Sequence, residues 1–169
     1  EEMVRPERGD DYGWPYCYYD TDLKQKVLAP EYGGDGKQVG RCARIQPALV
    51  SFPGHWAPLA LAFGDGKLGP AYASGVFVAF HGSWNRRKHD GYKVVYVPFA
   101  NSTPGQWEVF ADGFAGRRKG PGTAQHRPVG MAIAPDGSMY ITDDQAGRIW
   151  NVRYVELGAF ASGRRAWAW

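Results

Sequence analysis

Short apolar runs separated by turn residues make up most of this chain, and residues 127–150 show the pattern most clearly. Residues 129–133 and 139–141 are apolar runs of strand length. Between them, residues 135–137 read Pro-Asp-Gly, a hairpin turn whose glycine suits a positive φ. A pair of aspartates at residues 143–144 and a further strand-like run at residues 147–154 follow. This order of strands and turns is typical of a propeller blade.

An upstream segment repeats the same order of elements. Apolar runs occupy residues 58–63, 76–80 and 91–97, and Asp65-Gly66 supplies the turn after the first run. The upstream copy differs by insertions, of which the polar segment 83–90 is one. The repeat predicts an all-β fold in which antiparallel blades stack radially, that is, a β-propeller.

The repeat divides the chain into an open partial propeller over residues 1–155 and a tail over residues 156–169. Within the propeller we expect one blade at residues 51–114 and another at residues 127–155. Residues 1–50 are interpreted as the end of a blade plus a cysteine loop. Two to three blades cannot close a ring, because closed propellers have typically four to eight. We therefore expect this chain to be part of a longer protein, with assembly of several copies as the alternative.

The N-terminal 50 residues are the least regular part, with strand-like runs at 16–19 and 44–50 around a polar, glycine-rich segment. Cys17 and Cys42 flank that segment. An even number of cysteines and a loop with little core of its own favour a disulfide between them, and two free cysteines are the alternative. A disulfide would place the protein in an oxidising compartment.

Composition and charge exclude several classes of protein. With 44% hydrophobic and 15% aromatic residues, the 169-residue chain is expected to fold around a core. No apolar run approaches the roughly 20 residues of a membrane-spanning helix. Basic residues cluster at 86–88, 117–119 and 164–165, yet the net charge is only +3. We interpret each cluster as a solvated loop or tail and expect no nucleic-acid partner, with nucleic-acid binding as the alternative.

Propeller sites gather around the central channel, so polar residues at the ends of inner strands are candidates for chemistry. Arg127 precedes the inner strand of the second blade, and His55 holds the matching place before the first. An arginine can bind a carboxylate through two parallel hydrogen bonds, and a histidine could donate to a ligand or stack with it. The alternatives are a surface arginine and a structural histidine.

A pair of carboxylates, Asp143 and Asp144, directly follows the second strand of its blade. Such a pair could bind a cation, transfer a proton or orient Arg127. The alternative is an Asx-type turn with no chemistry.

The corresponding loop of the first blade carries hydrogen-bond donors and an aromatic ring. These residues are His81, Trp84, Asn85 and Arg86. They fit a planar, anionic or sugar-like ligand better than a metal, and the His and Cys residues of the chain lack the spacing of a zinc site. Phosphate-loop, dinucleotide-binding and GxSxG motifs are absent from the sequence.

Four motifs together resemble the glucose/sorbosone dehydrogenase family, in particular its sorbosone-dehydrogenase-like branch. They lie at residues 11–17 (with Tyr-Gly-Trp-Pro), 55–59, 81–86 (His-Gly-Ser-Trp-Asn-Arg), and 127–144 (Arg-Pro-Val-Gly, Pro-Asp-Gly and the aspartate pair). Members of this family are soluble quinoproteins with a six-bladed propeller. They use pyrroloquinoline quinone (PQQ) and calcium to oxidise sugars and related aldehydes.

The resemblance implies that Arg127 contacts the carboxylates of the quinone and that Asp144 supports this arginine. It also implies that the loops around His55 and residues 81–86 line the cofactor or the substrate side. The cofactor side is assigned His55, Trp84 and Arg86, and the substrate side His81 and Asn85. The cofactor-binding lysine of the family has no lysine at the matching place, and Arg86 is the expected substitute.

The general-base histidine of the family and its calcium-binding groups come from blades that precede the motif at residues 11–17. We therefore expect the C-terminal half of a PQQ-dependent soluble sugar dehydrogenase, with no metal ligand of its own and inactive without its N-terminal blades. Expected partners are a sugar or aldehyde substrate and an electron acceptor such as a cytochrome, and the expected location is periplasmic or secreted. A non-catalytic propeller binding module and a calcium-dependent propeller lactonase are the alternatives.

Overall fold

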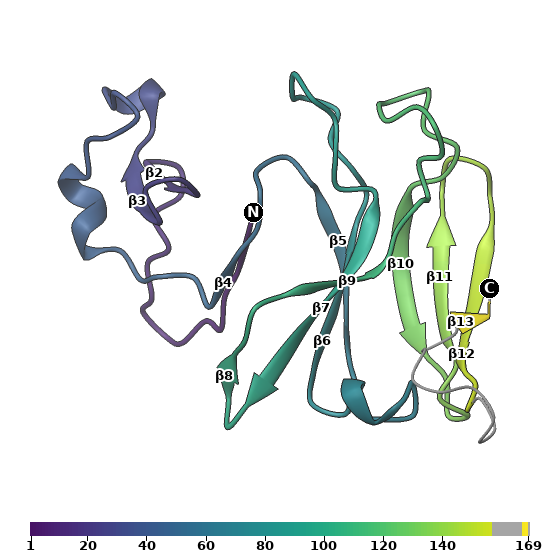
Figure 1. The fold of residues 1–169 in the computed structure, drawn as a ribbon. Helices are drawn as coiled ribbons and strands as arrows, with labels where there is room; N and C mark the ends of the chain where they lie inside the picture. The colour runs from purple at the N-terminus through teal and green to yellow at the C-terminus, as the bar shows by residue number, and fades with distance from the viewer. Residues whose placement is uncertain (157–166, 169) are drawn as a thin grey trace. The chain divides into compact units, whose positions relative to one another are not determined.

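Strands joined by turns and short 3-10 helices form the regular structure of the chain (Figure 1). The computed structural model describes residues 1–156 and 167–168. The chain divides into two units, Glu1–Gly54 and His55–Trp169, and each unit is described by itself. Within the described residues, no helix has the length and apolar character needed to cross a membrane.

The first unit contains two small antiparallel ladders, β1 with β4 and β2 with β3. Its elements in chain order are β1 (Glu2–Met3), β2 (Cys17–Asp20), β3 (Gln25–Leu28), η1 (Pro30–Tyr32), η2 (Gly40–Arg44) and β4 (Val50–Ser51). A disulfide between Cys17 and Cys42 joins the start of β2 to η2. Both cysteines are buried, so the crosslink lies in the interior of this small unit.

Residues 44–50 do not form the predicted strand. The helix η2 ends at the first residue of this run, and β4 begins at its last. Between them, the N–H groups of Gln46 and Leu49 donate to carbonyls of two separate segments rather than to one ladder. Pro47 has no N–H to donate, so these bonds to separate segments, rather than a ladder, set the conformation of the run.

The first sheet of the second unit is antiparallel, with the order β5-β6-β7 and with both β8 and β9 paired to β7. Its strands are β5 (Pro58–Phe63), β6 (Gly75–Phe80), β7 (Lys93–Ala100), β8 (Thr103–Pro104) and β9 (Glu108–Ala111). A further 3-10 helix, η3 (Pro70–Tyr72), lies between β5 and β6. The three upstream apolar runs are thus confirmed as strands.

The second sheet has the order β10-β11-β12-β13. Its strands are β10 (Pro128–Ile133), β11 (Met139–Asp143), β12 (Ile149–Tyr154) and β13 (Trp167–Ala168). The hairpin predicted at residues 135–137 joins β10 to β11, and Gly137 has a φ of +86°. Of the expected tail, residues 157–166 and 169 lie outside the described residues, whereas β13 pairs with β12.

The two sheets of the second unit share one hydrophobic core. Phe77 and Tyr96 of the first sheet pack with Met139, Ile141 and Val152 of the second, and each is at most 1% exposed. Successive side chains of a strand point to opposite faces, so these residues fill the faces that the sheets turn toward each other. Burying a side chain of this size stabilises the fold by about 1.5–3 kcal/mol. The all-β fold class is confirmed, and two stacked antiparallel sheets are the arrangement of neighbouring propeller blades.

Candidate functional site

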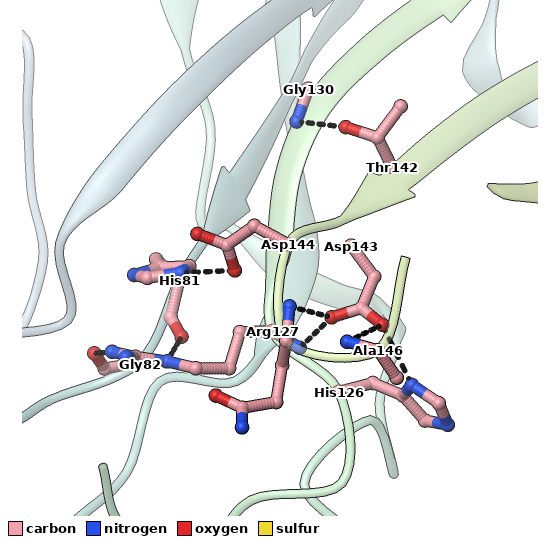
Figure 2. Close-up of polar contacts among 10 residues, drawn as sticks. His81, Gly82, His126, Arg127, Gly130, Thr142, Asp143, Asp144 and Ala146 are labelled. Carbon is pink, nitrogen blue, oxygen red and sulfur yellow. Dashed lines mark hydrogen bonds and ion pairs between the residues drawn. The ribbon is translucent and has the colours of Figure 1, made fainter. Parts of the chain in front are cut away.

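Three strand ends meet in the second unit and carry predicted site residues (Figure 2). The strand β6 ends just before His81, β10 begins just after Arg127, and β11 ends just before Asp144. Pro128 lies opposite Asp143 in the register of β10 and β11. The register therefore brings the residue that precedes β10 next to the turn that follows β11.

The strand β10 is bulged beside this turn. Its register shifts between Pro128 and Met131, and the Gly130 N–H donates to Thr142 Oγ1 at 2.8 Å. A Cβ on Gly130 would lie only 2.9 Å from that hydroxyl, so glycine permits the close approach. Bulges often occur next to functional sites because they bend the strand and re-aim its side chains. Here the bulge separates the regular ladder from Arg127.

Asp143 closes the turn that follows β11. Its buried carboxylate accepts hydrogen bonds from the backbone N–H of Arg127 at 2.8 Å, of Gln145 at 3.0 Å and of Ala146 at 3.1 Å. The fourth partner is His126 Nδ1 at 2.8 Å. Burial would raise the pKa of Asp143, but these hydrogen bonds outweigh it and hold the pKa below its ordinary value. Asp143 therefore forms the Asx-type turn that the sequence left open as an alternative.

Asp144 makes a different contact. Its side chain is 58% exposed, and its Oδ1 lies 2.9 Å from Nε2 of His81. Among the described residues, Asp144 pairs with His81 and not with Arg127. The support of Arg127 that the resemblance implies for Asp144 stays a prediction, and the contact between these two residues in the described part of the chain runs through His81. The two neighbouring carboxylates serve different partners and do not form one paired site.

The Arg127 guanidinium is held by backbone carbonyls. Its Nε donates to the carbonyl of His81 at 3.1 Å, and its Nη2 donates to the carbonyl of Gly82 at 2.8 Å. The ring of Tyr92 lies 5.7 Å from the Cζ atom. An arginine has five N–H donors, so three remain after these two bonds. Within the described part of the chain, no carboxylate forms an ion pair with this half-buried cation.

Gly82 can present its carbonyl to Arg127 because it lacks a side chain. Its φ is +94°, and a Cβ built there would lie 2.2 Å from the ring of Tyr92. Tyr92 is itself 1% exposed and donates from its hydroxyl to the carbonyl of Ser83 at 2.6 Å. The packing of Gly82 on this ring fixes the position of the carbonyl that orients the guanidinium.

Three of the predicted site residues come together in one hydrogen-bonded cluster: Arg127, His81 and Asp144. The other predicted residues lie on two loops beside it: His55, Trp84, Asn85 and Arg86. Trp84 is 68% exposed, Asn85 is exposed and Arg86 is half-buried. His55 is exposed with a φ of +64°, and its neighbour Trp56 accepts a hydrogen bond from the Gly82 N–H.

The residues that hold the cluster in place through packing and hydrogen bonds were not predicted from the sequence. They are Gly82, Tyr92 and His126. His126 lies edge-on against Trp150, with 5.0 Å between ring centroids, while its other side bonds Asp143. The one available signal was a glycine two positions after the end of an apolar strand. Its contact with an aromatic ring ten positions later could not be read from local patterns.

Metal-ligating side chains do not gather in the described residues. No group of three or more His, Cys, Asp or Glu side chains there could hold a metal ion. Arg127 keeps three N–H donors after its two hydrogen bonds and has exposed aromatic and amide side chains nearby, so the cluster can bind an anion through a positioned cation.

Comparison with known proteins points to one family. The family model described as TrAA12-like matches residues 1–155. The sequence is 30% identical over 167 residues to a pyrroloquinoline quinone-dependent pyranose dehydrogenase of Coprinopsis cinerea, a match that covers 83% of this chain. It covers only 22% of that relative, so the chain corresponds to a part of the longer enzyme.

Solved structures give the same assignment. The holo PQQ domain of pyranose dehydrogenase from Coprinopsis cinerea matches with a TM-score of 0.65 and 28% identity, over 85% of this chain and 40% of that one. A glucose dehydrogenase matches with a TM-score of 0.61 and 19% identity, over 89% of this chain and 37% of that one. The second likeness is one of fold, and it agrees with an open, partial propeller.

Proposed function

Because the chain belongs to the TrAA12-like family, we propose that it supplies an anion-binding part of the cofactor pocket in a PQQ-dependent sugar dehydrogenase. The family resemblance predicted from the sequence is confirmed, since its relatives include a PQQ-dependent pyranose dehydrogenase. In this proposal the complete protein oxidises a pyranose or related aldose and delivers the electrons to an acceptor such as a cytochrome.

The observation that carries the proposal is the state of Arg127. The guanidinium is fixed by the carbonyls of His81 and Gly82, three of its N–H donors remain, and no carboxylate of the described residues neutralises it. A cation that is already oriented loses little freedom when it binds an anion. The carboxylates of PQQ are planar acceptors that match the fork of an arginine, so this donor set fits the cofactor.

Each residue of the cluster has a part in this scheme. When bound, the quinone would accept the hydride that leaves the sugar. Arg127 would bind and orient a quinone carboxylate, and Asp143 would fix the backbone from which that arginine extends. His81 would act as a positioning residue, since its carbonyl holds Arg127 while its imidazole is occupied by Asp144.

The exposed loop residues complete the proposal. The ring of Trp84, 68% exposed, would offer a face to the quinone, and Asn85 would offer hydrogen bonds to the sugar. We place calcium and the general base in other parts of the complete protein. The Cys17–Cys42 disulfide supports a periplasmic or secreted location, because such bonds persist in oxidising compartments.

The test is sugar-dependent reduction of a small dye by the complete protein at increasing PQQ concentrations. We expect Arg127→Ala to raise the PQQ concentration for half-maximal activity by at least about tenfold, the loss of a charge-assisted bidentate pair. Arg153→Ala is the matched control, because this arginine is exposed on β12 of the same sheet. Equal PQQ requirements for Arg127→Ala and wild type would refute the assigned role. Absence of PQQ-dependent sugar oxidation in the wild type would favour a binding module.

A further inference from the structure

Two loops that are distant in sequence touch each other beside the candidate site. Loop 83–90 connects β6 to β7, loop 115–125 connects β9 to β10, and Figure 1 shows both at the same end of the two sheets. Lys119 of the second loop donates to Asp90 of the first at 2.8 Å. A Cβ on the buried Gly120 would lie 3.2 Å from the His89 ring, so the backbone of one loop packs on the other.

The contact between the loops is an ion pair that persists at neutral pH. Burial would raise the pKa of Asp90, but the hydrogen bond from Lys119 and the charge of Lys93 outweigh it and lower the pKa. The same hydrogen bond raises the pKa of Lys119. The two loops therefore form one continuous surface, which we call the basic loop pair.

The basic loop pair concentrates positive charge. Its basic side chains are Arg86, Arg87, Lys88, Arg117, Arg118 and Lys119, and Asp90 is its one carboxylate. Six cations against one anion give the pair a net charge of +5, whereas the whole chain carries only +3. Five of the six are exposed, Arg86 being half-buried. From the sequence, the basic clusters at 86–88 and 117–119 are interpreted as two separate solvated loops. In the fold, the two loops contact each other through Lys119 and Asp90.

The composition of this surface favours a protein partner. Three of its exposed cations are arginines, namely Arg87, Arg117 and Arg118. Arginine is among the residues most enriched in protein interfaces and in their binding hot spots. A positive field of this density attracts acidic proteins over long range and speeds their association.

The surface is joined directly to the residues that hold Arg127. Loop 83–90 leaves the sheet at Gly82, whose carbonyl accepts from Arg127, and returns at Tyr92, whose ring lies 5.7 Å from the guanidinium carbon. A partner seated on the basic loop pair would therefore lie next to the proposed cofactor pocket. Electron transfer needs such proximity.

We propose that the basic loop pair is the docking surface for an acidic electron-accepting protein. The inference rests on the proposed function. Oxidation of one sugar to its lactone removes two electrons and two protons. The electrons would pass one at a time to two acceptor molecules, and the protons would pass to water.

The test uses the complete, PQQ-loaded protein with three acceptors: a small neutral dye, an acidic cytochrome c and a basic cytochrome c of similar reduction potential. We expect the wild type to reduce the acidic cytochrome faster than the basic one at low ionic strength, with the difference lost at high salt. Arg87→Glu/Lys88→Glu and Arg117→Glu/Arg118→Glu should each slow the acidic cytochrome about tenfold and leave dye reduction unchanged. Arg8→Glu/Arg44→Glu, exposed in the first unit, is the control with the same change in charge.

The outcomes separate the two proposals. Dye reduction with equal rates for both cytochromes, or with no effect of the loop reversals, would overturn the docking surface alone. Loss of retention on a sulfated polysaccharide in the reversals, with unchanged cytochrome rates, would also overturn it and assign the loops to a polyanion. Absence of dye reduction by the wild type would overturn the proposed function and this inference together.

Discussion

Asp144, which directly follows β11, holds His81, which directly follows β6 of the other sheet, through a 2.9 Å contact between Oδ1 and Nε2. The backbone carbonyl of His81 accepts a hydrogen bond from the Arg127 guanidinium. Asp144 therefore helps to position Arg127 by holding the histidine whose carbonyl orients the guanidinium. These two hydrogen bonds join residues that are 63 and 46 positions apart in sequence and connect the two sheets. They make the orientation of Arg127 depend on how the blades pack.

Replacing Asp144 should weaken the orientation of Arg127 without removing its charge. We expect Asp144→Ala to lower PQQ affinity by about three- to tenfold, because one supporting hydrogen bond is worth about 0.5–1.5 kcal/mol. Asp144→Asn, which can still accept from His81, should recover most of the affinity. Titration of the three proteins with PQQ measures this. A loss of affinity well above about tenfold would exceed the worth of one supporting hydrogen bond and would mean that Asp144 contacts the cofactor itself.

The buried carboxylate of Asp143 should make the stability of the protein depend on pH in the acidic range. Its pKa in the folded protein lies below the ordinary 3.8, so its contribution is present above that value and lost as pH falls through the folded pKa. We expect the wild type to lose more stability between pH 5 and about pH 2 than Asp143→Asn does. Urea unfolding followed by tryptophan fluorescence at a series of pH values checks this. Parallel curves for both proteins would contradict the assignment.

Gly82 should be intolerant of any side chain. We expect Gly82→Ala to lower the free energy of unfolding by several kcal/mol, because a Cβ would lie 2.2 Å from the Tyr92 ring. The substitution should also displace the carbonyl that holds Arg127. Gly113→Ala is the matched control: its φ is +86° and a Cβ there meets nothing within 4 Å. That control isolates the backbone cost, about 1–2 kcal/mol. Similar unfolding midpoints for the two variants would show that the Tyr92 contact is not decisive.

The disulfide should stabilise the first unit. Cys17 and Cys42 are separated by 25 residues, and closing such a loop is worth about 3–4 kcal/mol on the chain-entropy model. We expect Cys17→Ser/Cys42→Ser to open this unit while the second unit stays folded. Hydrogen exchange read separately for residues 1–54 and 55–156 measures this. Unchanged protection in the first unit would show that its own packing suffices.

Much of the sheet structure could be predicted from the sequence because it depends on local patterns. The runs 58–63 and 129–133 became strands within one residue of their predicted bounds, and Pro-Asp-Gly at 135–137 formed the predicted hairpin. Alternating apolar residues and turn glycines carry this information within a few positions. The run at 44–50 failed because hydrogen-bond partners elsewhere in the chain decide its conformation.

The site was only partly predictable, because neighbouring residues of the same type have different partners and different exposure in the fold. Asp143 and Asp144 are chemically identical in sequence, yet one is buried under four hydrogen bonds and the other is 58% exposed against His81. The role of His81 lies in its backbone carbonyl, for which side-chain identity gives no signal. The union of the two basic loops is a tertiary contact that composition cannot reveal.

The proposed function depends on Arg127 binding a carboxylate of the quinone. The most direct measurement is a tryptophan-fluorescence titration of the complete protein, with wild type and Arg127→Ala each titrated with PQQ and with its trimethyl ester. We expect wild type to bind PQQ at least about tenfold more tightly than the ester, and Arg127→Ala to bind both equally weakly. If Arg127→Ala still preferred PQQ over its ester as strongly as wild type does, the guanidinium would not be the carboxylate anchor.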